Sequence, residues 1–202
     1  GHEAVGASGP TRAPAGTSSA SLCCCTSSRM SSAATADPPP FPDGTPGPAL
    51  SCAVNGNLRE EWQTYLDETL RHQDVVRSLC AALDIDPDEE SPGRAVMRHQ
   101  GESLVKAMQM AKATAPQAAA QLVACECVVL AETKDHSNWE LLGRVAERAT
   151  GEAGKALKAA HADVEKDEDH HYYHTKGWCR ELWIESLGMP AVLPPPEASV
   201  TM

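Results

Sequence analysis

Aromatic residues and long apolar runs are what this chain of 202 residues has least of. Aromatic side chains make up 4% of the sequence and include a single Phe. Ala and Leu are frequent instead, a balance that favours helices packed through small and unbranched side chains. No segment approaches the roughly 18 apolar residues that a membrane span requires. The net charge of −11 argues against nucleic acid or an anionic membrane as a partner.

The eight cysteines lack the spacing of a zinc finger. Cys23, Cys24 and Cys25 lie in a polar segment, and Cys125 and Cys127 would lie about 200° apart on a helix. We interpret the cysteines as reduced, mostly buried thiols of a cytoplasmic protein. The sequence shows neither a Gly-rich phosphate loop before a helix nor a local Ser/His/Asp or Cys/His arrangement. We therefore assign no catalytic residue of these kinds.

The two ends of the chain have the composition of tails. Residues 1–57 are rich in Ala, Ser, Thr, Pro and Gly without apolar periodicity, so they cannot bury enough surface to offset their conformational entropy. We predict a disordered tail there and an extended tail over 189–202. Residues 1–29 precede Met30 and are interpreted as added or upstream sequence, with a transit peptide as the alternative.

Between the tails, helical patterns dominate. The first predicted helix covers about 58–83 and stops before Pro87, and Ser91 with Pro92 caps a second helix over about 92–112. A third covers about 116–149, and a fourth covers about 152–175. A short helical extension continues past Gly177 to residue 188. Four long helices with short connections predict an all-α fold in which residues 58–188 form a four-helix bundle.

Polar side chains interrupt the inward stripe of three predicted helices. His72 does so in the first helix, Glu132 and His136 in the third, and Glu168 and His171 in the fourth. An ionised carboxylate in a helical core costs several kcal/mol unless it is paired. A metal cluster explains the pattern because cations compensate several carboxylates and imidazoles complete the shell.

Two alternatives to a metal cluster stay open. The same groups could instead form a buried Glu–His network without metal. They would be exposed to solvent if the predicted inward stripes extend beyond the surface that each helix buries. One face of the fourth helix projects away from its inward stripe and is predicted to be solvated. It carries Asp163, Lys166, Asp167 and Asp169. The second helix offers no convincing ligand, because His99 and Glu102 lie beside its stripe.

Three segments resemble the ferritin-like superfamily, nearest the YciF-type bacterial stress-associated four-helix bundles. These segments are YLDET at 65–69, AETKDHSNWELLGRVAERATG at 131–151 and ALKAAHADVEKDEDHH at 156–171. The resemblance implies a ligand from the first helix at Glu68. It also implies Glu132 with Asp135 or His136 from the third helix, and Glu165 with Glu168 from the fourth. The third helix departs from the pattern, because its His follows Glu132 by four residues and not three.

The combined interpretation is a site for two iron or manganese ions. Its expected ligands are Glu68, His72, Glu132, Asp135, His136, Glu165, Glu168 and His171. The resemblance implies that such a protein reacts with oxygen or peroxide, in iron oxidation or stress protection. A non-catalytic helical interaction module, for example a homodimer, is the main alternative. A hemerythrin-like oxygen carrier is a third, although it needs more His than carboxylate.

Overall fold

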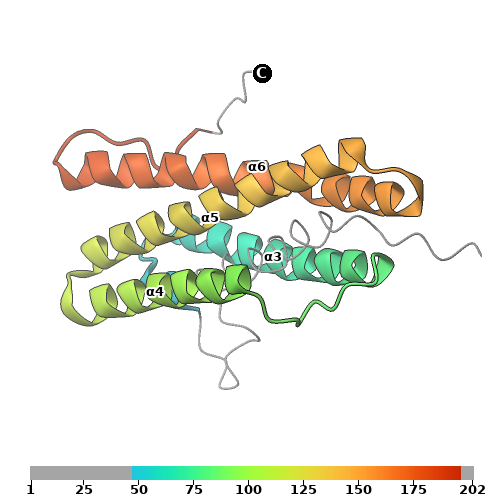
Figure 1. Cartoon of the computed structure of the whole chain (residues 1–202). Coiled ribbons are helices and arrows are strands. Elements are labelled where there is room, and N and C mark those ends of the chain that lie inside the picture. Colours follow the sequence, from blue (N-terminus) through green and yellow to red (C-terminus); the bar gives the residue numbers. More distant parts are fainter. Residues whose placement is uncertain (1–46, 197–202) are drawn as a thin grey trace, which may run out of the picture.

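The computed structural model describes residues 47–196, and this part of the chain is helical without strands (Figure 1). Its helices are α2 (Pro48–Cys52), α3 (Gly56–Ala82), α4 (Pro92–Thr114), α5 (Gln117–Arg148) and α6 (Gly151–Ser186). The predicted all-α class is confirmed. The four long helices begin and end within a turn of their predicted bounds, apart from the end of α6.

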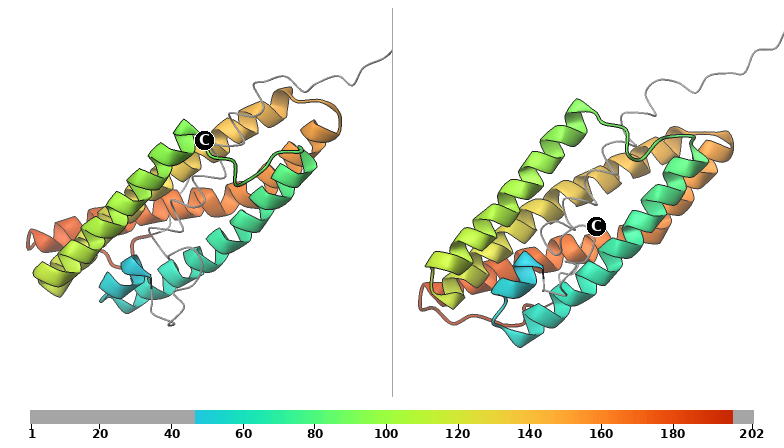
Figure 2. Two further views of the ribbon diagram at one scale, coloured as in Figure 1. Left: turned by 60° about the horizontal axis from the view of Figure 1, so that its bottom comes forward. Right: turned by 90° about the horizontal axis from the view of Figure 1, so that it is seen from below.

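Successive long helices run antiparallel to one another (Figures 1 and 2). Two-residue connections at 115–116 and 149–150 join α4 to α5 and α5 to α6. Helix α5 packs along α6 and α4, and α6 also packs against α3. The short α2 contacts α3, α4 and α5. Within residues 47–196, no helix has the length and apolar character needed to cross a membrane.

Local hydrogen bonds explain where the helices start. Ser91 Oγ accepts from the backbone N–H of Arg94 at 3.2 Å, which confirms the predicted cap of α4. The side-chain oxygen of Asn55 caps α3 by accepting from the backbone N–H of residues 57 and 58. Gly151 has a φ of +67°, a conformation that favours glycine and allows the tight turn between α5 and α6.

The predicted boundary of the N-terminal tail at residue 57 is wrong. Residues 48–52 form α2, and Ala49 and Leu50 are buried. The backbone N–H groups of Val54 and Asn55 both donate to Gln121 Oε1 at 2.7 Å. A five-residue helix is too short to show periodicity in the sequence, and long-range contacts hold it. Residues 1–46 and 197–202 of the predicted tails lie outside the described part of the chain.

The C-terminal segment folds back along α6. This helix is continuous past Gly177, so the predicted helical extension is part of α6. The backbone N–H of Val192 donates to Glu181 Oε2 at 2.9 Å. A Cβ on Gly177 would lie 3.2 Å from Pro195 Cβ, so the missing side chain leaves room for the returning segment. The described residues 189–196 are therefore packed against the domain.

The buried core has two apolar parts at different levels of the long helices. The first apolar core includes Leu58, Trp62, Tyr65, Leu122, Val128, Trp178 and Leu182. The second apolar core includes Val76, Leu79, Trp139, Leu142, Leu157 and Val164. Each long helix except α4 contributes to both. The described cysteines form no disulfide, so packing and hydrogen bonds hold the fold together.

Candidate functional site

A layer of buried polar side chains lies between the two apolar cores. We define this polar layer as Thr69, His72, Glu132, Asp135, Glu168, His171 and Thr175. None of these residues is more than 2% exposed. They come from α3, α5 and α6, whose inward stripes carry them at the same level. Acids and imidazoles from three helices therefore meet away from solvent.

His72 lies between two carboxyl groups of α6. Its Nδ1 is 2.8 Å from Glu168 Oε1, and its Nε2 is 3.2 Å from Asp167 Oδ2. Burial lowers the pKa of His72 to about 4, although the hydrogen bond to Asp167 opposes this shift. Burial, followed by the charge of Glu132, raises the pKa of Glu168 to about 8. Both shifts favour the uncharged forms of the pair, in which a protonated Glu168 carboxyl would donate to Nδ1 and Nε2–H would donate to Asp167.

His171 lies between the carboxylates of α3 and α5. Its Nε2 is 2.7 Å from Glu68 Oε2, and its Nδ1 is 3.8 Å from Glu132 Oε2. Burial by itself lowers the pKa of His171, but the hydrogen bond to Glu68 and the charges of Glu132 and Glu168 raise it to about 9. The Glu68 carboxylate therefore favours the protonated form of this ring. Glu68, with 31% of its side chain exposed, is the least buried of these groups.

Asp135 is the least satisfied member of the polar layer. Neither of its carboxyl oxygens has a hydrogen-bond partner among the described residues, and the same holds for Glu168 Oε2. Burial, followed by the charges of Glu168 and Glu132, raises the pKa of Asp135 well above its usual range. Buried polar atoms without partners cost free energy. The protein's own groups thus leave acceptor capacity in the polar layer.

Three of the predicted ligands lie outside the polar layer: Glu68 contacts its edge through His171, and His136 and Glu165 lie elsewhere. His136 Nε2 is 2.8 Å from Asp169 Oδ1, and its ring stacks on Tyr172 with centroids 4.7 Å apart. Glu165 has 60% of its side chain exposed. The expected place of His136 on the inward stripe of α5 is wrong, and Glu165, predicted beside the stripe of α6, is exposed. Helix α5 is covered by both α4 and α6, so its inward side turns toward Asp135 and away from His136.

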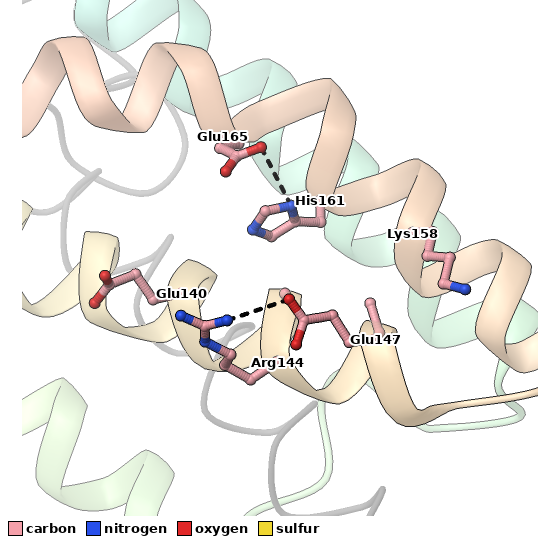
Figure 3. A pocket seen from close by; sticks show the side chains of 8 residues that line it. Glu140, Arg144, Glu147, Lys158, His161 and Glu165 are labelled. Atoms are coloured by element: carbon pink, nitrogen blue, oxygen red, sulfur yellow. Dashed lines mark hydrogen bonds and ion pairs between the residues drawn. The ribbon is translucent and has the colours of Figure 1, made fainter. Parts of the chain in front are cut away.

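Glu165 lines a shallow pocket between α5 and α6 (Figure 3). The pocket has a volume of about 310 Å³. His161 Nδ1 lies 3.5 Å from Glu165 Oε2, and across the pocket Arg144 donates to Glu147 at 3.2 Å. A Cβ on Gly143 would lie 2.5 Å from His161 Nε2. The pocket holds charges of both signs, some of them already paired, and no residue that lines it belongs to the polar layer.

Some acids of the predicted solvated face of α6 contact side chains of other helices. Asp167 contacts both Arg71 and His72, and Asp169 contacts His136. Asp163 lies 3.3 Å from Arg71 with more than half of its side chain exposed. Helical periodicity could not reveal the role of Asp167, because this residue lies beside the inward stripe and reaches His72 from its edge.

The carboxyl and imidazole groups of the polar layer meet in pairs. Among the described residues, Glu61, His170 and His174 bring three potential metal-binding atoms together, all within 4.8 Å of one another. Comparison of the chain with protein-family models, with curated proteins and with solved structures gives no match. These two groups of side chains are therefore the basis on which a function can be inferred.

Proposed function

We propose that the polar layer binds two iron or manganese ions in a ferritin-like di-metal carboxylate protein that reacts with oxygen or peroxide. The observation that carries this proposal is the donor set. It consists of two imidazoles and four carboxylates on three helices, namely Glu68, His72, Glu132, Asp135, Glu168 and His171. Di-iron and di-manganese carboxylate sites use donors of these kinds between the helices of a bundle.

The chemistry of the donors fits such ions. Glu168 and His171 reproduce the Glu-x-x-His step that these sites use on a helix. The two oxygens of Asp135 have no partner among the described residues and face the charges of two other acids. Divalent cations shared by several carboxylates would compensate these charges. His99 and Glu102 of α4 are exposed, so this helix adds no donor.

The order of the helices differs from that of ferritin-like bundles, so the proposal depends on the donor set. Ferritin-like bundles contain one long crossover connection, whereas successive helices are antiparallel here and α4 to α6 are joined by two-residue turns. Up-down-up-down bundles also hold metals between facing helices. A hemerythrin-like site needs more His than carboxylate, and the donor set has the opposite ratio.

The chain itself would position, shield and protonate the site. Iron or manganese held by these donors would supply electrons to oxygen or peroxide. Trp62 and Tyr65 on one side and Trp139 on the other are buried and exclude water. Burial, followed by Glu61, raises the pKa of Tyr65, so its phenol stays protonated. The partly exposed Glu68 holds the Nε2–H of His171 and lies where small solutes would approach.

Metal content tests the proposal directly. Protein purified without chelator would be titrated with ferrous iron in the absence of oxygen and then exposed to oxygen. We expect close to two ions per chain whose binding depends on Glu168, and a carboxylate-bridged iron absorption. Less than about 0.3 ion per chain would contradict the proposal. Glu168→Gln should reduce binding, whereas Glu165→Gln on the exposed face of the same helix should match the wild type.

A metal-free interaction module is the second candidate. The close contacts of His72 with Glu168 and of His171 with Glu68 favour it, because protons already compensate much of the charge. A buried polar network of this kind can fix the register of packed helices. Replacing Glu132 with Gln together with Glu168 with Met would then raise thermal stability and change no metal-dependent signal. The di-metal proposal expects that signal to disappear.

A further inference from the structure

Glu61, His170 and His174 form a second group of potential ligands, outside the polar layer. Glu61 lies on α3, and the two histidines lie one turn apart on α6. Their ligand atoms are all within 4.8 Å of one another. The two imidazole rings are stacked with centroids 5.1 Å apart. His170 is exposed while the other two are largely covered, so solvent reaches the group from one side.

The C-terminal segment determines which nitrogen of His174 can bind an ion. The Nε2 atom lies 3.1 Å from the backbone carbonyl oxygen of Pro195, which can only accept a hydrogen bond. Nε2 therefore carries a proton, and Nδ1 points at Glu61 Oε1 at 2.5 Å. In a neutral ring the Nδ1 lone pair would face a carboxylate oxygen. A cation shared by these atoms removes that conflict: a proton fits at this distance, and a metal ion would bind after the two atoms move slightly apart.

Buried aromatic side chains hold the Glu61 carboxylate in place. Trp178 Nε1 donates to Oε2 at 2.8 Å, and the Tyr65 hydroxyl donates to Oε1. Hydrogen bonds of this kind orient metal ligands and add to their affinity. The Tyr65 ring also packs on His171, with centroids 4.2 Å apart. It therefore stands between this group and the polar layer.

We propose that Glu61, His170 and His174 bind one divalent transition-metal ion, independently of the polar layer. Two imidazoles and one carboxylate suit ferrous, zinc, nickel or cobalt ions rather than magnesium or calcium. Three protein ligands leave coordination positions open, and the exposed side at His170 lets an ion enter without parting the helices. The carbonyl of Pro195 makes the C-terminal segment part of this site.

Cobalt binding measures this site separately from the polar layer. The full chain carrying Glu132→Gln and Glu168→Gln, which removes two donors of the polar layer, would be titrated with Co²⁺ alone. We expect one ion per chain with visible d–d absorption. Adding His170→Ala, an exposed substitution that should not affect folding, should weaken binding at least about tenfold. Adding His174→Ala or Glu61→Gln should do the same, with circular dichroism verifying the fold.

His99→Ala is the matched control, because His99 is an exposed histidine of α4 outside both groups. It should leave the Co²⁺ affinity unchanged. Absence of Co²⁺ binding in the starting variant, or equal affinity after His170→Ala, would overturn the proposal. If the wild-type chain binds a single ion that His170→Ala removes, this site exists and the polar layer fails as a metal site.

Discussion

The polar layer and the two apolar cores beside it use the same three helices in opposite ways. In the apolar cores, side chains such as Trp139 and Leu142 are buried among apolar neighbours. One and two turns before Trp139, Asp135 and Glu132 are buried just as deeply, beside other ionisable groups. Packing explains the first arrangement but makes the second unfavourable. The difference indicates that the apolar cores stabilise the fold, whereas burial of the polar layer costs free energy.

The largest effect should come from emptying an apolar core. Trp139→Ala removes a side chain that is 2% exposed, so we expect the free energy of unfolding to fall by about 3–5 kcal/mol through lost transfer energy and a cavity. Urea unfolding followed by circular dichroism measures this change. A loss below about 1 kcal/mol would mean that the core collapses around the gap and is not tightly packed.

In the polar layer we expect a substitution that raises the free energy of unfolding. Asp135→Asn keeps the shape of the side chain and removes a carboxyl group that is strongly disfavoured there. We expect the metal-free protein to gain roughly 1–3 kcal/mol of unfolding free energy and to lose stabilisation by ferrous iron. Asp74→Asn on the exposed side of α3 should change stability by less than about 0.5 kcal/mol. A destabilised Asp135→Asn variant would argue against a strained polar layer.

A third contrast is the response to pH. Glu168 and His171 bind their protons more tightly in the folded chain, with pKa values of about 8 and about 9 against ordinary values of 4.5 and 6.5. Their contribution to the free energy of unfolding is therefore complete below their ordinary pKa values. It is lost as the pH rises through their pKa values in the folded chain. His72, with its pKa lowered to about 4, acts in the opposite direction but only between pH 4 and 6.5.

Metal-free protein should accordingly lose stability between pH 6.5 and 9. For each proton involved, the unfolding free energy should fall by about 1.4 kcal/mol per pH unit. Chemical unfolding at a series of pH values measures the slope. Glu168→Gln should flatten it below pH 8, whereas Glu165→Gln should not. Equal slopes for the wild type and both variants would show that the polar layer does not titrate in this range.

The smallest effect is expected in the pocket between α5 and α6. Gly143→Ala must displace the His161 ring, because the new Cβ would meet its Nε2. The displaced ring is the end of a movable side chain, and Ala favours a helix more than Gly does. We expect stability to change by less than about 1 kcal/mol and the His161–Glu165 contact to be lost. Histidine NMR shifts would report that loss, and unchanged shifts would contradict the crowding.

Much of this fold could be predicted from helical periodicity. The inward stripes of α3 and α6 were predicted correctly at His72, Glu168 and His171, because each helix buries one narrow face. On α5 the choice between Asp135 and His136 depends on a rotation of the helix that its two neighbours impose. The contacts of Asp167 depend on Arg71, which belongs to another helix. Local sequence carries no signal for contacts of these kinds.

The arrangement of α5 and α6 has a consequence for how the polar layer comes together. Glu132, Asp135, Glu168 and His171 all belong to one helical hairpin whose turn consists of residues 149 and 150. Contacts within a hairpin are close in sequence and form quickly, whereas α3 must dock from a distant part of the chain. Arrival of α3 brings Glu68 and His72 and closes the layer. Partial undocking of this one helix is then the simplest motion by which the buried interior could exchange its contents.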